Sequence, residues 1–207
     1  MHPRSPNPCC PWWLISPAPE AGGHEPSTLY GVFKLANEGT ARVYWNENGV
    51  SSIGLRPMTI YGPGRDQGMT STPTKAIAAA VLGQPYTISF GGRTLFQYTE
   101  DAARTFVIAS QSGLEGAHTF NLGGNLAHLR EFVAAIDAAV PGAAGRIEIT
   151  EPGLPFPEQI ASETLAALGP VPVTRLATGI ARTAEVFQAL QARGALIPEE
   201  LGLEPLA

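Results

Sequence analysis

The sequence predicts an α/β fold. Its 207 residues are 44% hydrophobic and 15% charged, a composition typical of a globular chain that can bury one substantial core. Apolar residues at helical spacing recur along the chain, and short runs with β-branched residues lie between them. Glycine and proline pairs separate these segments, as they do at turns. Helical and extended segments that alternate in this way are typical of α/β proteins.

The charge and hydropathy of the chain exclude several kinds of partner. The formal net charge is -5, and the sequence has no run of Lys or Arg. This balance argues against a nucleic acid or an anionic membrane surface as partner. No apolar run approaches the ~20 residues that a membrane span requires, so we expect a soluble protein without a membrane partner.

The cysteines and histidines do not indicate a disulfide framework or a metal site. Cys9 and Cys10 are the only cysteines and they are adjacent, so a reducing cytoplasm is the expected location. The histidines show no spacing typical of metal ligands, and we predict no metal. They are His2, His24, His118 and His128.

Residues 1–26 are predicted to be an irregular or disordered N-terminal segment. They contain seven prolines and show neither a helical nor a strand period. A signal peptide is the alternative, because Arg4 precedes a short apolar patch. Pro11 interrupts that patch, and no small-residue cleavage site follows.

A helix is predicted over residues 27–42, with a cap at Pro26-Ser27. Its apolar residues recur at helical spacing, and we expect this stripe to pack the helix on a sheet. The stripe consists of Leu29, Val32, Phe33, Ala36, Thr40 and Val43.

The next elements are a strand and a second helix. Residues 50–55 predict a short buried strand, which Arg56-Pro57 ends because proline cannot donate to a central ladder. The chain is expected to turn at residues 62–64, Gly-Pro-Gly. Thr72 and Pro73, followed by strong helix formers, predict a helix that stops at Gly83.

A hairpin and a third helix are expected after Gly83. Residues 86–90 alternate with period two, Gly91-Gly92 marks a turn, and residues 94–98 are expected to return antiparallel. A helix then begins at Thr99. Its first turn contains Asp101, whose carboxylate interacts favourably with the helix dipole. This structural role accounts for Asp101, so we assign it no catalytic role.

The rest of the chain repeats the pattern. Residues 118–122 predict a strand, and Gly123-Gly124 is expected to turn directly into a helix ending at Pro141-Gly142. His128 on that helix is interpreted as exposed or capped rather than catalytic. Ile147 and Ile149 mark a strand, residues 151–157 a proline-rich connector, and residues 174–194 a final helix.

The first helix also holds the candidate catalytic pair, Tyr30 and Lys34. Residues four apart lie on the same side of a helix, so the phenol and the ammonium are expected to share one space. A fixed positive charge favours the phenolate form of a nearby phenol, which predicts Tyr30 as the acid/base and Lys34 as its tuner. The alternative is one aromatic and one solvated lysine on a surface helix. Glu38 and Arg42 continue the line and are interpreted as an ordinary surface pair.

The surroundings of this pair resemble a known family. Y-G-V-F-K-L-A-N-E at residues 30–38, followed by G-L-R-P-M-T-I-Y-G-P-G-R at residues 54–65, resembles the NAD-dependent epimerase/dehydratases, the extended short-chain dehydrogenases/reductases. The resemblance covers residues 26–194. The resemblance implies that the cofactor is NAD, and NADP is not excluded. It also implies that the cofactor binds at Tyr30, at Lys34 and along one backbone segment. That segment is Pro57, Met58, Thr59 and Ile60, which are equally well interpreted as a strand end and a turn.

The resemblance also implies that part of the fold is missing. A dinucleotide site of this kind needs a first β-α-β unit with a glycine-rich turn, and the sequence has no such motif. Only 29 residues precede Tyr30, whereas that unit and its following strands need well over ~100. We therefore expect residues 27–207 to be a C-terminal part: an incomplete Rossmann-like, doubly wound sheet plus a smaller substrate-binding α/β part. Cofactor binding is expected to be weak.

The resemblance implies a small-molecule substrate, such as a nucleotide sugar or another hydroxylated sugar. Family members hold phosphate with an arginine in an R-D segment. Residues 92–101 lack that pair, because Arg93 is displaced by about one position, and Arg65 is a second candidate for an anionic group. The resemblance does not distinguish between epimerase, dehydratase and dehydrogenase activity. The competing hypothesis is a non-catalytic α/β remnant whose exposed edges favour a partner or a homo-oligomer.

Overall fold

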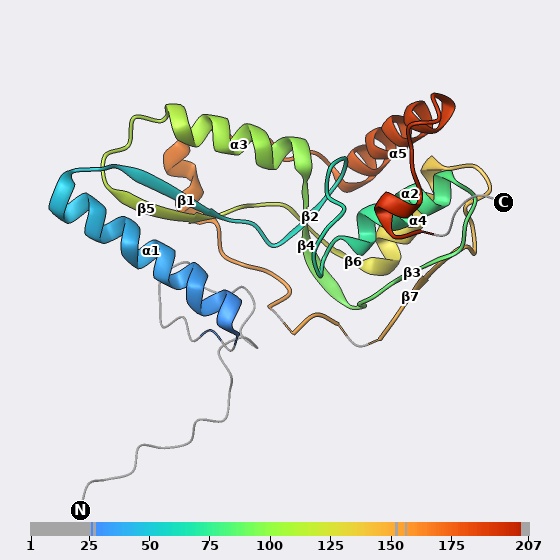
Figure 1. Ribbon diagram of the computed structural model, residues 1–207, viewed down its shortest axis with the longest axis horizontal. Helices are drawn as coiled ribbons and strands as arrows, with labels where there is room; N and C mark the ends of the chain where they lie inside the picture. Colours follow the sequence, from blue (N-terminus) through green and yellow to red (C-terminus); the bar gives the residue numbers. More distant parts are fainter. Residues whose placement is uncertain (1–25, 27, 152, 156, 204–207) are drawn as a thin grey trace, which may run out of the picture.

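The computed structural model describes residues 26, 28–151, 153–155 and 157–203 (Figure 1). Apart from Pro26, the predicted irregular segment lies outside these residues, as does Ser27. Helices and strands alternate along the described chain, which confirms the α/β prediction. The elements are α1 (Leu29–Asn48), β1 (Ser52–Arg56), β2 (Thr59–Tyr61), α2 (Thr72–Val81), β3 (Tyr86–Ile88), β4 (Arg93–Tyr98), α3 (Thr99–Gln111), β5 (Ala117–Asn121), β6 (Asn125–His128), α4 (Leu129–Ala139), β7 (Ile147–Ile149), the 3-10 turn η2 (Glu163–Leu168), α5 (Leu176–Ala192) and the 3-10 turn η3 (Glu199–Leu201).

One half of the molecule is a two-stranded parallel sheet, β1 and β5, that pairs Ser52 with Ala117 and Arg56 with Asn121. Helices α1 and α3 lie on its two sides (Figure 1). The buried side chains of this half come mainly from α3, β5 and η2, and they include Ala102, Phe120 and Leu165. Helix α1 contributes none, because no residue of α1 is buried.

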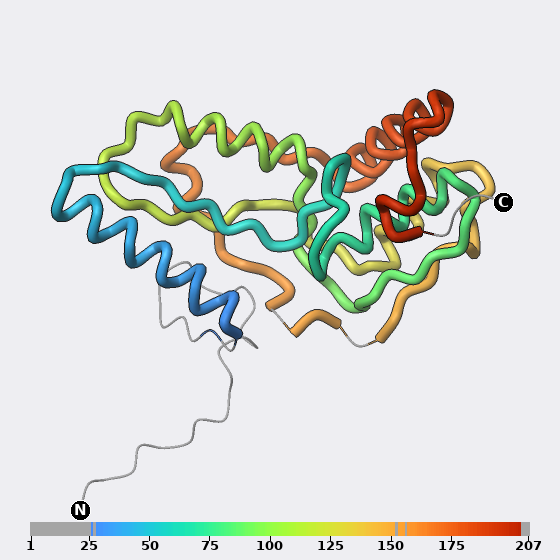
Figure 2. Tube along the Cα trace, viewed as in Figure 1, coloured from blue at the N-terminus to red at the C-terminus, as the bar shows by residue number. Residues whose placement is uncertain are grey.

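The other half holds the larger core. Its sheets are β2-β4-β6, in which β2 and β4 are parallel and β6 antiparallel, and the parallel pair β3-β7. Helices α2, α4 and α5 pack against one another beside these strands. Figure 2 shows the chain pass from α1 and β1 into this half and return to the other half through α3 and β5. It comes back for β6, α4 and β7, leaves once more for η2, and ends in this half with α5.

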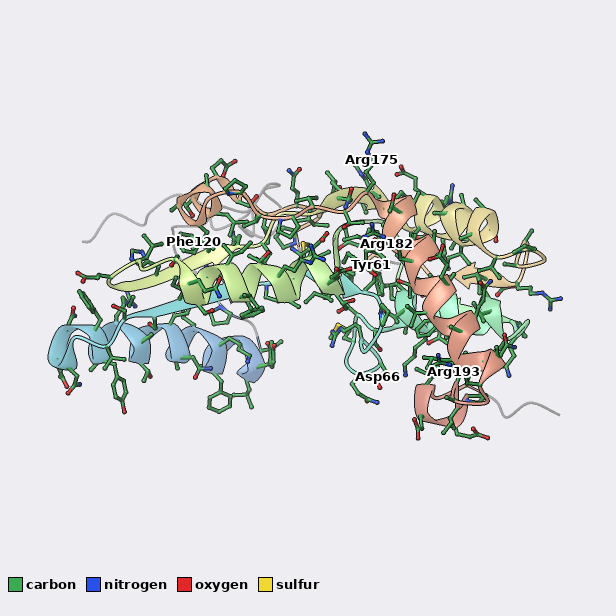
Figure 3. The ribbon with its side chains drawn as sticks, turned by 90° about the horizontal axis from the view of Figure 1, so that it is seen from above. Tyr61, Asp66, Phe120, Arg175, Arg182 and Arg193 are labelled. Atoms are coloured by element: carbon green, nitrogen blue, oxygen red, sulfur yellow. The ribbon has the colours of Figure 1, made fainter. Side chains whose placement is uncertain are left out.

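Tyr61 is the centre of the larger core. Its ring is fully buried and meets Phe96 and Phe132 edge-on, with centroids 6.0 and 5.3 Å away. Its hydroxyl donates to the carbonyl of Leu176 at the start of α5 (3.3 Å), and Figure 3 shows Tyr61 near Arg182 of that helix. Burial raises the pKa of the Tyr61 phenol strongly, so this core tyrosine stays protonated.

Gly179 of α5 lies directly against Tyr61, and this contact gives a testable prediction. A Cβ at Gly179 would overlap the Tyr61 hydroxyl and lie 3.0 Å from its Cζ, and the buried ring cannot move aside. Gly179→Ala is therefore expected to lower the free energy of unfolding by about 1–3 kcal/mol. Gly39→Ala in α1 is the matched control, because a Cβ there has no neighbour within 4 Å. It is expected to raise stability by about 0.5–1 kcal/mol.

Urea denaturation of both variants tests this prediction. If Gly179→Ala were as stable as Gly39→Ala, the tight contact between α5 and Tyr61 would be contradicted.

The predicted hairpin over residues 86–98 is wrong. β3 pairs parallel with β7, whereas β4 pairs with β2 and β6, so the two strands lie in different sheets. The chain does turn at Gly92, which has φ +73°. Gly91 meanwhile pairs with Gly153, and this close approach directs β3 toward the distant β7 segment. Glycines show where a chain turns, but the partner of each strand is decided by burial.

The structure also changes the predictions for residues 125–128 and for Asp101. Residues 125–128 form strand β6 instead of helix, and α4 starts at Leu129 with His128 as its N-cap. The His128 Nδ1 accepts from the amide of Arg130 (3.1 Å), so His128 precedes the helix and caps it, instead of lying on it as predicted. Asp101 does more than favour the α3 dipole: its carboxylate accepts the Thr174 hydroxyl (2.9 Å) and so ties α3 to the segment before α5.

Candidate active site

Tyr30 and Lys34 lie together on the first two turns of α1. The helix begins after Thr28, whose hydroxyl accepts the amide of Gly31 (3.1 Å). The Lys34 Nζ lies 5.2 Å from the centroid of the Tyr30 ring, within the range of a cation–π contact. The Tyr30 side chain is 72% exposed, so its hydroxyl is open to a ligand. The pair thus combines a proton-carrying group and a fixed cation on one accessible surface.

The apolar stripe of α1 does not face the sheet, contrary to the sequence prediction. Leu29 and Phe33 are 76% and 65% exposed, and Val32 and Val43 are exposed as well. The opposite side of the helix lies over β1 and β5, where Leu35, Glu38 and Ala41 line a groove. Helical periodicity identified an apolar side of the helix. It could not show that the opposite side, which carries Glu38, would lie against the sheet.

That ion pair joins Glu38 to Arg56 at the end of β1. The guanidinium donates from Nε to one carboxylate oxygen at 2.7 Å and from Nη2 to the other at 2.6 Å. Both side chains are about one-quarter exposed. The sequence interpretation of Glu38 as the surface partner of Arg42 was therefore wrong. One feature of the sequence could have indicated a more distant partner for Glu38: Arg56 is a charged residue at the end of an apolar strand.

Glu38→Gln is expected to lower the free energy of unfolding by about 1–2 kcal/mol. The substitution removes the charge from a two-point hydrogen bond between α1 and β1, and partial exposure keeps the loss modest. Glu47→Gln, on an exposed position of the same helix, is the control and is expected to change stability by less than about 0.5 kcal/mol. Chemical denaturation measures both, and equal effects would contradict the structural role of Glu38.

A groove of about 720 Å³ separates α1 from the sheet. One wall is formed by α1, and the other by β1 and β5, including Gly54, His118 and Thr119. His118 is not a free catalytic base here, because its Nε2 bonds to the carbonyl oxygen of Glu115 (2.8 Å) and its ring stacks on Phe120. Figure 3 labels Phe120 on β5, the strand that forms this wall of the groove. The first residue of α1 that lines the groove is Leu35, directly after Lys34.

The backbone segment predicted to line a nicotinamide pocket links β1 to β2. Pro57 is exposed, Met58 donates its amide to Gln97 Oε1 (2.7 Å), and the Thr59 hydroxyl bonds to Thr94 in the core (2.8 Å). Ile60 packs on the smaller core. Contacts with β4 and with the smaller core therefore fix the backbone of this segment.

Gln97 is the residue of this region that sequence reasoning missed. It is buried in β4, and its amide nitrogen donates to the carbonyl of Leu122 while its oxygen accepts from Met58. It therefore fastens the ends of two sheets to each other. The available signal was a single amide between two aromatic residues, Phe96 and Tyr98, in an otherwise buried strand.

The structure does not bring the two candidate arginines to the Tyr30–Lys34 pair. Arg65 stays within the loop after β2, where its Nη2 donates to the Thr70 hydroxyl (3.1 Å). Arg93 is exposed at the start of β4, opposite His128 of β6. Within the described part of the chain, no three metal-binding side chains cluster. None of the helices there combines the length and apolar character needed to cross a bilayer.

Comparisons with known proteins show the family and the fold of this chain. The family model described as "NAD dependent epimerase/dehydratase family" matches residues 16–123. The fold is similar to UDP-glucose 4-epimerase from Thermotoga maritima, solved with UDP-glucose (TM-score 0.74, 20% identity, 86% of this chain and 59% of that chain). It is also similar to UDP-glucuronic acid 4-epimerase from Bacillus cereus, solved with NAD (TM-score 0.69, 22% identity, 84% and 57%).

A dehydrogenase shares the same fold. A partial consensus L-threonine 3-dehydrogenase is similar with a TM-score of 0.70 and 23% identity, over 85% of this chain and 62% of that one. The chain spans about 60% of the length of these solved structures. No match was found among curated proteins. The prediction of a partial Rossmann-like fold is confirmed by these structural matches.

Proposed function

This chain belongs to the NAD-dependent epimerase/dehydratase family. We propose that it functions as an NAD(P)-dependent oxidoreductase of the sugar epimerase/dehydratase type. Tyr30 and Lys34 form the acid/base pair in this proposal, and residues 27–207 are its C-terminal part. The observation that carries the proposal is the contact between the two side chains, with Lys34 Nζ 5.2 Å from an exposed Tyr30 ring.

The described residues fit one end of the cofactor. An exposed phenol and an exposed ammonium, side by side, match the hydroxyls of a ribose, and the segment from Pro57 to Ile60 presents a fixed backbone. The pyrophosphate end needs a glycine-rich turn at a helix N-terminus, and the described elements contain no such strand–turn–helix unit. We therefore expect weak binding of NAD by this chain.

The roles of the protein groups follow from their chemistry. The Tyr30 phenolate takes the proton from a substrate hydroxyl and returns it in the reverse direction. The Lys34 ammonium stabilises the negative charge on that phenolate and hydrogen-bonds ribose hydroxyls. Bound NAD would supply the hydride acceptor for the carbon that carries this hydroxyl.

The substrate in this proposal is a small hydroxylated molecule, with a nucleotide sugar as the first candidate. Two of the similar structures are epimerases of UDP-sugars, solved with UDP-glucose or with NAD. Arg65 and Arg93 remain the proposed contacts for an anionic group. The proposal includes a cytoplasmic location and a homo-oligomer, and it leaves epimerase, dehydratase and dehydrogenase as alternatives.

A second candidate is a non-catalytic α/β module that depends on a partner. It is favoured by one observation: α1 buries none of its residues, although it is 20 residues long. The two-stranded β1-β5 sheet beside it is also smaller than an independently stable sheet. Under this alternative, Tyr30 and Lys34 would be surface residues without a cofactor.

Isothermal titration calorimetry with NAD, and separately with NADP, distinguishes the two candidates. The enzyme proposal predicts saturable binding with a Kd on the order of 1 mM, weaker by roughly tenfold in Lys34→Met because a charged hydrogen bond is lost. Lys75→Met is the matched control, since Lys75 of α2 is the only other lysine in the sequence. No binding at millimolar cofactor would support the partner-dependent module.

A further inference from the structure

The side chain of Gln97 in β4 joins the link between β1 and β2 to the end of β5. It is 4% exposed, its Oε1 accepts the amide of Met58 (2.7 Å), and its Nε2 donates to the carbonyl of Leu122 (2.7 Å). Both partners are backbone groups outside the strands. Met58 precedes β2, whose ladder with β4 begins at Thr59, and Leu122 follows β5, which ends at Asn121. Gln97 thus extends the hold of β4 beyond its own ladder.

Close packing fixes the side chain of Gln97 in this position. Gly124 lies directly against β4: a Cβ there would overlap the carbonyl oxygen of Phe96 and lie 2.9 Å from the Cγ of Gln97. The orientation of the amide is fixed as well. Turning it over would set its NH₂ group against the amide of Met58 and its oxygen against the carbonyl of Leu122. The amide is therefore a rigid bridge between two chain segments.

This bridge lies where α/β proteins bind their ligands. The parallel strands β1 and β5 end at the paired residues Arg56 and Asn121, and Gln97 holds the chain just beyond both ends. Figure 1 shows β4 at the junction of the two halves of the molecule. Ligands of open α/β sheets occupy the crevice outside the carboxyl ends of parallel strands. That place includes residues 57–60, the segment proposed to present its backbone to the cofactor.

We infer that Gln97 is a positioning residue for NAD: its amide holds the backbone of Met58 and the carbonyl of Leu122 in the arrangement that receives the cofactor. The inference rests on the proposed function, because it concerns the same cofactor. Packing alone does not explain the choice of residue. An apolar side chain would fill the same volume between the buried residues Phe96 and Tyr98, whereas joining two backbone groups requires both a donor and an acceptor.

Titration of the full chain with NAD, followed by NMR, tests this role. Gln97→Met keeps the length of the side chain but loses both hydrogen bonds. The Kd for NAD is expected to rise about threefold to tenfold, because the freed segment must be ordered again when the cofactor binds. Without cofactor, hydrogen exchange at the Met58 amide is expected to accelerate at least ~tenfold.

Thr183→Val is the matched control for Gln97→Met. Thr183 is fully buried in α5, and its hydroxyl donates to the carbonyl of Gly179 (2.7 Å) in the larger core. Its replacement also removes a buried side-chain hydrogen bond and is expected to lower stability. It should leave the Kd for NAD unchanged, because it does not touch the segments that Gln97 joins.

Gln97→Glu separates positioning from stability. The protonated carboxyl offers the same donor and acceptor as the amide, whereas the ionised form has acceptors only and opposes the carbonyl of Leu122. Burial raises the pKa of the introduced carboxyl, and so does the carboxylate of Asp101, which lines the same small cavity as Gln97. The Kd for NAD is expected to match that of the unsubstituted chain at about pH 5 and to exceed it at least ~threefold at about pH 9.

The outcomes separate this inference from the proposed function. Unchanged NAD affinity in Gln97→Met, or a Kd ratio for Gln97→Glu that does not vary with pH, overturns the inference while NAD binding stands. If circular dichroism shows that Gln97→Met is unfolded, the pH dependence of Gln97→Glu decides, since its protonated form retains both hydrogen bonds. An unsubstituted chain that does not bind NAD overturns the proposed function, and this inference with it.

Discussion

Tyr30→Phe is expected to lower kcat for NAD-dependent turnover by about 10²–10⁴-fold, because it removes the only group proposed to carry the substrate proton. The ring and its contact with Lys34 are retained, since the cation meets the ring face at 5.2 Å. KM for the cofactor should therefore change much less than kcat. Steady-state kinetics of the purified protein with NAD and a UDP-sugar, with the sugar products separated by chromatography because an epimerase or dehydratase regenerates NAD, measures both quantities.

Tyr44→Phe is the matched control for this substitution. Tyr44 is an exposed tyrosine on the same helix, ten residues after Lys34, and loss of its hydroxyl is expected to leave kcat unchanged. Equal kcat values for Tyr30→Phe and the unsubstituted protein would remove Tyr30 from the mechanism. If the unsubstituted protein neither turns over nor binds NAD, the partner-dependent module is the better description.

Phe132→Ala is expected to lower the free energy of unfolding by about 3–5 kcal/mol, the largest stability effect predicted for this protein. The side chain is fully buried at the first turns of α4. It stacks on Phe96, with centroids 4.8 Å apart, and meets Tyr61 edge-on at 5.3 Å. Alanine would leave a cavity that three neighbouring elements cannot close. The loss corresponds to roughly 6–20 °C in Tm for a chain of this size.

Differential scanning calorimetry measures this loss, and Phe106→Ala controls for it. Phe106 is half exposed on α3, so its truncation should shift stability by less than about 0.5 kcal/mol. A similar Tm for the two variants would mean that the aromatic cluster around Phe132 is not the centre of the core.

The sequence predicted most elements but fewer of their relationships. The helices at residues 72–83 and 174–194 were predicted closely, because proline and glycine mark helix ends by local geometry. Strand β6 was missed, since four residues between a glycine pair and a helix are too few to show a period. The hairpin was wrong because Gly91-Gly92 describes a turn, whereas β3 finds its partner some sixty residues later, at Ile147–Ile149.

The candidate site shows the same division. The closeness of Tyr30 and Lys34 could be predicted, because four helical residues fix their separation. The partner of Glu38 could not, because Arg56 lies 18 residues away on another element. Gln97 could not be assigned either, since its role depends on where Met58 and Leu122 come together in space.

The sequence by itself determined the α/β class, both ends of α2 and α5, the family and the shared side of Tyr30 and Lys34. Each of these depends on residues within a few positions of one another, where backbone geometry leaves little choice. The first helix runs to Asn48, six residues beyond its predicted end. Tertiary structure alone decided which strands pair, which way α1 turns its apolar residues and what holds residues 57–60 in place. Those outcomes depend on burial and on charge contacts between segments that are distant in the sequence. A periodic pattern identifies an apolar side of a helix, but it does not identify the element that packs on that side.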